Sequence, residues 1–313
     1  HSFPTRRSSD LHFLVAFDAG KTTFRHSKYS EYKGGRQKTP PELSEQFPYI
    51  RQLLDAYHIK RYELDNYEAD DIIGTLSRQA DEEDFETIII TGDRDLTQLA
   101  TDNVTIYYTK KGVTDVDHYT PKFIAEKYNG LVPKQIIDMK GLMGDTSDNI
   151  PGVAGVGEKT AIKLLNQFES VEGVYEHIEE VTAKKLKEKL INSKDDALMS
   201  KDLATINVHS PIEVSLEDTK LTLQDDTTKK IELFKKLEFK QLLADIDTSS
   251  TNEEVIDKTF EIEQDFQNVD LNDLNEAVIH FELEGTNYLK DTILKFGFYT
   301  NHQHVVINAE DVK

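Results

Sequence analysis

The chain has 313 residues, of which 37% are hydrophobic, and it contains 15 Phe and 13 Tyr. This length and composition can build one or two globular domains. The absence of cysteine excludes a disulfide framework and a thiolate metal site, and no apolar run is long enough to span a membrane. The net charge of −21 argues against nucleic acid as a partner, but about half of the excess lies after residue 250. We therefore expect an intracellular protein and leave a nucleic-acid partner open.

The first eleven residues, HSFPTRRSSDL, have neither the apolar region of a signal peptide nor a helical period. They resemble the read-through translation of a common sequencing adapter. We interpret residues 1–11 as a non-native segment in place of the natural N-terminus and leave them out of the fold prediction. An ordinary disordered tail is the alternative interpretation.

Strand and helix signals alternate from residue 12 onward. Short apolar runs at 12–17 and 86–91 suit buried parallel strands, and helical patterns cover 47–57 and 68–80. The alternation predicts an α/β fold with a mostly parallel sheet and helices on both faces. Ligands bind at the carboxyl ends of strands in such sheets. We therefore expect Asp18 and Asp93, which follow the two strands, to reach one edge from neighbouring strands.

The stretch YEADD places Glu68, Asp70 and Asp71 on the first turn of the helix predicted at 68–80. Acids at a helix N-terminus are favoured by the helix dipole, so capping is one explanation. Further acids follow in TGDRDL and GDTSDN. An EF-hand loop requires acids at alternate positions with Gly sixth and Glu twelfth, which neither segment has. Separate caps and Asx turns remain the simple alternative.

Carboxylates that converge need compensating cations. Each pair about 5 Å apart repels by roughly 3 kcal/mol at an effective dielectric near 20, and several such pairs would cancel much of a domain's net stability. Oxygen-only ligands select Mg²⁺ or Mn²⁺, and a pocket with many carboxylates can seat two ions for attack on a phosphodiester. The predicted metal ligands are Asp18, Glu68, Asp70, Asp71, Asp93, Asp95, Asp145 and Asp148.

Five motifs occur in order: VAFDAG…FRH…YKGGR, YEADD, TGDRDL, MGDTSDNIPGV and GVGEKTA. Over about residues 12–245 they resemble the 5′ nuclease domain at the N-terminus of bacterial DNA polymerase I, a relative of the flap endonucleases. The resemblance implies a monomeric, cytoplasmic, nucleoid-associated bacterial enzyme with no membrane contact. Its implied activity is that of a structure-specific 5′→3′ exonuclease and flap endonuclease that removes RNA primers and 5′ flaps in replication and repair. Its implied partners are branched or nicked duplex DNA and RNA primer–DNA hybrids.

The resemblance also divides the carboxylates between two metal sites. It implies that the first site uses Asp18, Glu68, Asp70 and Asp93. It implies that the second uses Asp95, Asp145 and Asp148, with Asp71 in support.

The segment at 21–38, KTTFRHSKYSEYKGGRQK, interleaves basic and aromatic residues and is too rich in glycine to be one regular helix. Alone it would be interpreted as a solvated loop. In the family the free 5′ strand passes under a helical arch that starts here. The resemblance therefore implies that Arg25 and Lys33 contact the scissile phosphate and stabilise its developing charge, and that Lys21 and Arg36 bind the strand.

The stretch IPGVAGVGEKTAIKLL has the pattern of a helix–hairpin–helix, with glycines that permit close backbone approach before a new helix. The N-terminus of that helix suits a phosphate, although a plain turn is the simplest alternative. In the family this element grips the duplex, often with K⁺ between backbone carbonyls and DNA phosphate. The residues implied to bind DNA are Gly152, Gly155, Gly157, Lys159 and Thr160.

These features predict a nuclease α/β core with its arch at 12–134, a helix–hairpin–helix part at 135–245 and a polar linker at 246–257. Residues 258–313 resemble the opening hairpin of a 3′→5′ proofreading-type α/β domain. Active members carry Asp-x-Glu where this chain has Glu282, Leu283 and Glu284. We therefore expect this part to be an inactive remnant.

The family also begins with a central strand whose terminal Asp is a metal ligand, and that segment is absent from this sequence. We therefore expect impaired cleavage with retained binding of branched DNA. Two alternatives stay open: a nuclease-fold module that binds flaps without cutting them, and a metal-dependent ribonuclease of the PIN type. The helix–hairpin–helix pattern disfavours the PIN type.

Overall fold

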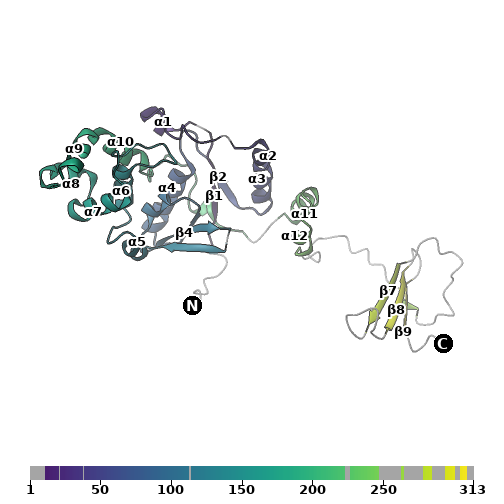
Figure 1. Ribbon diagram of the computed structural model, residues 1–313. Coiled ribbons are helices and arrows are strands. Elements are labelled where there is room, and N and C mark those ends of the chain that lie inside the picture. The colour runs from purple at the N-terminus through teal and green to yellow at the C-terminus, as the bar shows by residue number, and fades with distance from the viewer. Residues whose placement is uncertain are drawn as a thin grey trace. The chain divides into compact units, whose positions relative to one another are not determined.

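The computed structural model describes residues 11–20, 22–37, 39–112, 114–222 and 226–246, together with the backbone of four strands further along the chain. The chain divides into two compact units, His1–Ile246 and Asp247–Lys313. The first unit has the predicted α/β class, with helices packed around short strands (Figure 1).

The strands of the first unit form two separate sheets within the described residues. Strand β1 (Leu14–Ala16) pairs in parallel with β2 (Lys60–Tyr62). Strand β3 (Thr87–Thr91) pairs in parallel with β4 (Val104–Lys111), which pairs antiparallel with β5 (Asp115–Tyr119). The prediction that the strands before Asp18 and Asp93 are neighbours is wrong. The two strands are linked by helix α4, which contacts both.

Within the described residues, four helices lie between β1 and β3, and the last two of them follow the predicted periodicity. They are α1 (Phe24–Lys28), α2 (Pro41–Ser44), α3 (Phe47–Ala56) and α4 (Ala69–Glu82). Helix α4 buries Ile72 on its apolar face. Its N-terminus has a capping box, in which the Asp71 carboxylate accepts from the backbone N–H of Glu68. Part of the YEADD motif therefore caps the helix, which was the simpler of the two explanations.

A helical region packs against the second sheet, and α6 to α10 gather on one side of α4 (Figure 1). It contains α5 (Pro121–Lys127), α6 (Gln135–Met143), α7 (Glu158–Phe168), α8 (Val171–Glu176), α9 (Lys184–Asn192) and α10 (Lys194–Ala204). One hydrophobic core joins Ile89 of β3 and Ile106 of β4 to Leu142 of α6 and Leu165 of α7. Helix α6 also contacts the 3₁₀ turn η2 (Asp95–Leu99). The core therefore fixes the end of α6 beside the acidic TGDRDL segment.

The remaining elements of the first unit are the turns η3 (Ile178–Glu180) and η4 (Glu217–Thr219) and the helices α11 (Thr227–Lys236) and α12 (Lys240–Ala244). Helix α11 packs on α3. Near the start of the described chain, the Leu11 carbonyl accepts from the N–H of Leu221. Among the described helices, none is long and apolar enough to cross a membrane.

The second unit is described through four strands: β6 (Ile262–Glu263), β7 (Val278–Leu283), β8 (Ile293–Tyr299) and β9 (His304–Asn308). Their order is β6-β9-β8-β7, with β8 antiparallel to both of its neighbours. The paired strands expected there are present. Glu282 and Leu283 lie in β7, and Glu284 is outside the described residues, as are residues 1–10.

Candidate active site

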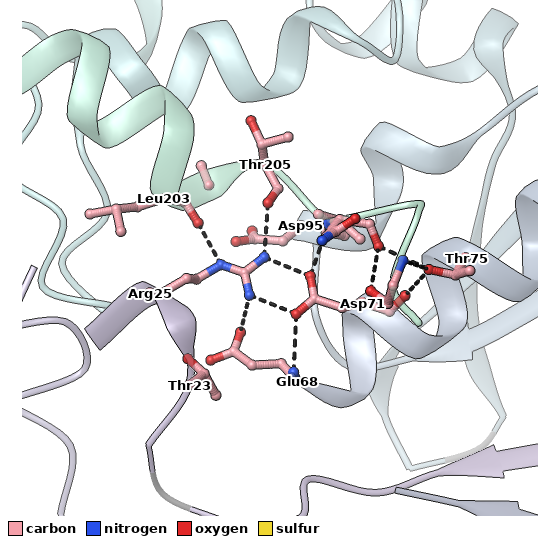
Figure 2. Close-up of polar contacts among 12 residues, drawn as sticks. Thr23, Arg25, Glu68, Asp71, Thr75, Asp95, Leu203 and Thr205 are labelled. Atoms are coloured by element: carbon pink, nitrogen blue, oxygen red, sulfur yellow. Dashed lines mark hydrogen bonds and ion pairs between the residues drawn. The ribbon is translucent and has the colours of Figure 1, made fainter. Parts of the chain in front are cut away.

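A buried ion pair ties the basic segment to the start of α4 (Figure 2). Arg25 of α1 donates to both oxygens of Asp71, at 2.8 and 2.7 Å, and lies 3.4 Å from Glu68. Its other donors reach the carbonyls of Leu203 at 3.0 Å and Thr205 at 2.8 Å, at the end of α10. The side chains of Arg25 and Asp71 are 2% and 0% exposed. One guanidinium therefore joins three parts of the chain.

This environment differs from the roles predicted for the two residues. Burial opposes the charge of Arg25, but the hydrogen bonds and charge of Asp71 raise the pKa of Arg25 above its ordinary value. Asp71 also accepts from the N–H groups of Glu68 and Asn207. Because these donors already fill both carboxylate oxygens, Asp71 has no oxygen left for a metal. Arg25 likewise presents no exposed face to a phosphate, so the structure assigns both residues to a structural clamp.

Four of the predicted ligands form a group around Asp70, which we call the Asp70 group: Asp18, Glu68, Asp70 and Asp93. Asp18 accepts from the N–H of Ala69 at 2.8 Å, and Asp93 accepts from the N–H of Asp95 at 2.9 Å. Within the described residues Asp70 has neither a hydrogen bond nor an ion pair. Burial and the charges of Asp93, Glu68 and Asp18 raise the pKa of Asp70 to about 7, although Lys33 opposes the shift. Asp70 is therefore a carboxylate without a dedicated partner.

A second acidic group surrounds a lysine that sequence reasoning missed. Lys140 of α6 donates to Asp95 and, at 2.5 Å, to Asp145, and we call these three residues the Lys140 group. Burial raises the pKa of Asp95 to about 6, although Lys140 opposes the shift, and Lys140 and Ser147 hold the pKa of Asp145 below its ordinary range against burial. Lys140 stands with Asp138 in the otherwise apolar stretch IIDMKGLM, so a charge in a largely buried helix was its signal.

Asp148 pairs with the basic segment. It accepts from Arg36 at 2.5 Å and lies 4.0 Å from Lys33, which donates to Glu68 at 2.7 Å. The buried hydroxyl of Tyr32 lies 3.2 Å from both Glu68 and Asp148. Sequence reasoning noted Tyr32 as an interleaved aromatic residue and missed this contact. The turn at 32–36 therefore faces the carboxylates.

The predicted many-carboxylate cage is not assembled in the described part of the chain. There, no group of three or more His, Cys, Asp or Glu side chains is arranged so that it could hold a metal ion. The premise that only metal ions balance these acids is wrong, because Arg25, Lys33, Arg36 and Lys140 pair with them. The donor set nevertheless fits a hard divalent cation, since it is oxygen-only and leaves Asp70 uncompensated.

The hairpin before α7 shows where glycine is required. Gly152 has φ +59, and a Cβ atom there would lie 2.1 Å from the backbone nitrogen of Gly144. Gly155 has φ +76, and its Cβ would meet the Lys189 ammonium at 2.4 Å. Gly157 differs, because a Cβ there would meet open space. Close backbone approach thus explains Gly152, the positive φ explains Gly155, and neither explains Gly157.

The remaining predicted DNA-binding residues lie at the start of α7 and in the basic segment. Lys159 is exposed and Thr160 is half-buried on the first turn of α7. Lys21 lies outside the described residues. The DNA-binding roles of these residues remain predictions.

Two sequence models of known families cover most of the first unit. That of the 5′-3′ exonuclease N-terminal resolvase-like domain matches residues 4–129, and that of the 5′-3′ exonuclease C-terminal SAM fold matches residues 131–227. The chain belongs to the 5′-3′ exonuclease family. This membership confirms the resemblance that was found in the motifs. Individual DNA polymerase I sequences are also similar to this chain.

The chain is 57% identical to DNA polymerase I of Bacillus subtilis (strain 168) over 311 residues, which are 96% of this chain and 35% of that protein. It is 59% identical to DNA polymerase I of Bacillus caldotenax over 244 residues, 78% of this chain and 28% of that protein. The chain therefore spans about a third of the length of these relatives. It corresponds to their 5′-3′ exonuclease domain, and nothing in the matches identifies residues 258–313 as a 3′→5′ domain.

Solved structures support the fold. T5 5′-exonuclease with bound zinc aligns with a TM-score of 0.53 at 25% identity, covering 62% of this chain and 74% of that chain. The bacteriophage T5 D15 flap endonuclease, in a complex with DNA and metal ions, aligns with a TM-score of 0.53 at 23% identity, covering 74% of this chain and 82% of that chain. The first unit therefore has the 5′-nuclease fold.

Proposed function

We propose that this chain is a metal-dependent, structure-specific 5′→3′ exonuclease and flap endonuclease. Its substrates are nicked or branched duplex DNA with a 5′ flap and RNA primer–DNA hybrids, and it removes primers and flaps. The observation that carries the proposal is the Asp70 group. The charges of Asp18, Glu68 and Asp93 act on Asp70 at the N-terminus of α4, and Asp70 has no partner among the described residues.

The proposed cofactors are two Mg²⁺ or Mn²⁺ ions, with K⁺ at the hairpin. The residues of the Asp70 group would hold one divalent ion, and Asp95, Asp145 and Asp148 would hold the other. Bound there, the ions would supply a hydroxide nucleophile and stabilise the charge that develops on the phosphodiester. The chemistry of the donor set supports this assignment, because every predicted ligand is a carboxylate.

Lys33 and Arg36 are the basic side chains that can exchange partners. They are 20% and 50% exposed, and each pairs with a predicted metal ligand. A substrate phosphate would compete with Glu68 and Asp148 for them, which aligns the phosphate with the carboxylates. Lys33 takes the proposed role at the scissile phosphate, and Arg36 binds the strand, together with Lys21.

Arg25 acts in the proposed mechanism as a positioning residue. It holds Asp71, and Asp71 caps the backbone N–H of Glu68 at the start of α4. This clamp fixes the first turn of the helix that presents Glu68 and Asp70. Farther from the reacting phosphate, the hairpin glycines with Lys159 and Thr160 would bind the phosphates of the duplex, which suits the N-terminus of α7.

A labelled 5′-flap duplex tests the proposal. We expect whatever flap release the wild-type chain retains to require Mg²⁺ and to stop in EDTA, and Asp70→Asn to lose it. Asp102→Asn is the matched control, because Asp102 is an exposed acid outside the two acidic groups. Cleavage that persists in EDTA contradicts the metal-dependent mechanism. Metal-independent flap binding without any cleavage supports the non-catalytic binding module instead.

A further inference from the structure

Lys140 stands between two carboxylates from different segments of the chain. Its ammonium donates to Asp95 at the start of η2 and to Asp145 in the loop that follows α6. The side chains of Lys140, Asp95 and Asp145 are 12%, 14% and 15% exposed. A lysine ammonium is a compact point charge. It therefore occupies the space that a cation bridging the two carboxylates would need.

Within the described residues, no ammonium bridges two members of the Asp70 group. Lys33, the cation that acts on Asp70, donates to Glu68 and also lies near Asp148. A divalent ion that enters the Asp70 group meets a carboxylate without a partner among the described residues. One that enters the Lys140 group meets an ammonium already bound between both of its ligands.

An ammonium and a divalent ion cannot share the position between Asp95 and Asp145, because like charges repel strongly at that separation. A cation that binds both carboxylates must therefore displace Lys140. The side chain can leave, since its flexible four-carbon stem starts on the last turn of α6 and the side chain is partly exposed.

We propose that Lys140 is a built-in competitor for the second divalent cation of the site. It holds Asp95 and Asp145 together in the metal-free protein and makes the two positions fill in order, the Asp70 group first and the Lys140 group at higher concentration. This inference rests on the proposed function, from which it takes the binding of divalent ions to these groups. The residue thereby sets the metal concentration at which the site is complete.

Titration of the whole chain with Mn²⁺, followed by electron paramagnetic resonance of the free ion, tests the proposal without any cleavage assay. We expect Lys140→Met to tighten the weaker of two binding sites by roughly 5- to 100-fold, the range typical of coupled sites. Lys140→Arg keeps the charge, so its weak site should remain weak. Lys201→Met is the matched control, because Lys201 also bridges two carboxylates, Asp138 at 2.7 Å and Glu172 at 2.6 Å. It should leave both sites unchanged.

Thermal unfolding gives a second readout. Loss of the ammonium leaves Asp95 and Asp145 repelling each other, so Lys140→Met should melt below the wild type in EDTA and gain more than the wild type from Mn²⁺. If the variant is unfolded in EDTA, saturating Mn²⁺ must restore its fold. A variant that stays unfolded in Mn²⁺, or one whose weaker site is no tighter than that of the wild type, overturns the proposal.

The same titration separates this inference from the proposed function. If Asp70→Asn abolishes the tighter site while Lys140→Met changes nothing, the role of Lys140 is wrong and the metal-dependent function stands. If neither Asp70→Asn nor Asp93→Asn alters Mn²⁺ binding, the metal assignment itself fails, and the inference fails with it.

Discussion

The Asp70 group and the Lys140 group contain the same kind of side chain and differ in how their charge is balanced. Among the described residues, the main charges acting on Asp70 are three carboxylates and Lys33, and its pKa rises, mainly through burial, to about 7. Asp145 has Lys140 and Ser147, and these partners hold its pKa below the ordinary range against the effect of burial. The number of acids in a motif therefore does not by itself predict how strongly the site binds a metal ion. The binding also depends on which cationic side chains the fold places among the acids.

The clamp beneath the Asp70 group should give the largest effect on stability. Arg25→Met leaves the Asp71 carboxylate buried without its counter-ion, which typically costs about 3–5 kcal/mol of unfolding free energy. Urea unfolding in EDTA measures the change. Arg61→Met is the control, because Arg61 also contacts both oxygens of an aspartate, Asp55 at 2.8 and 3.1 Å, but on the surface. Arg61→Met should lower the unfolding free energy by no more than about 1 kcal/mol. Equal losses of unfolding free energy in the two variants would show that the buried clamp stabilises the fold no more than a surface ion pair does.

Lys33 should affect cleavage more than stability. In the proposed mechanism its ammonium moves from Glu68 to the scissile phosphate, so Lys33→Ala should lower single-turnover flap cleavage by about 10²- to 10³-fold, as loss of one charge-stabilising donor does elsewhere. Flap binding should change little. Lys28→Ala is the control, because Lys28 lies on the same segment and pairs with exposed Asp202. A variant that loses binding and cleavage in equal measure contradicts this division.

The two groups should respond to pH with opposite signs in metal-free buffer. Because the pKa of Asp70 is raised in the folded protein, Asp70 stabilises the fold below about pH 4. This stabilisation is lost as the pH rises through about 7. Asp70→Asn should therefore raise the unfolding free energy at pH 8 by about 1–3 kcal/mol and lose that gain toward pH 4. Asp145→Asn should lower stability at pH 8, because a depressed pKa stabilises the fold above the unfolded pKa and ceases to do so as the pH falls through the folded value. Urea unfolding at several pH values measures both changes, and the same sign for the two would remove the contrast between the groups.

The hairpin should give the smallest effect, on binding alone. Lys159→Ala removes an exposed charge from the first turn of α7 and leaves both acidic groups intact. We expect flap affinity to fall and the slope of log affinity against log salt to decrease by about 1, the loss of one phosphate contact. Fluorescence anisotropy over a salt series measures it, with Glu158→Gln as the neighbouring control. Unchanged binding at every salt concentration would show that Lys159 does not contact the duplex.

The sequence predicted those features that depend on local pattern. The strand at Thr87–Thr91 and the helices at Phe47–Ala56 and Ala69–Glu82 follow from apolar spacing. The membership of the Asp70 group was implied by the resemblance to the 5′ nuclease family. The pairing of the strands was not predicted, because β1 and β3 each pair with a strand, β2 or β4, that was not identified from the sequence.

The compensating cations could not be predicted, because each depends on contacts between distant segments. Lys140 is 45 residues from Asp95, and Arg36 is 112 residues from Asp148. Arg25 was expected at the substrate because the family resemblance implies an arch that starts in its segment. Its burial depends on carbonyls at the end of a helix that no motif connects to it.

The clamp at Arg25 also has a consequence for the order in which the molecule matures on the ribosome. Two of its acceptors, Leu203 and Thr205, lie 178 and 180 positions further along the chain. Because synthesis proceeds from the N-terminus, every predicted metal ligand emerges before those carbonyls do. A nascent chain arrested before Leu203 thus contains all of the predicted metal ligands, but its clamp is incomplete. We expect a protease to cut such a chain near the start of α4 until the last turn of α10 has been synthesised.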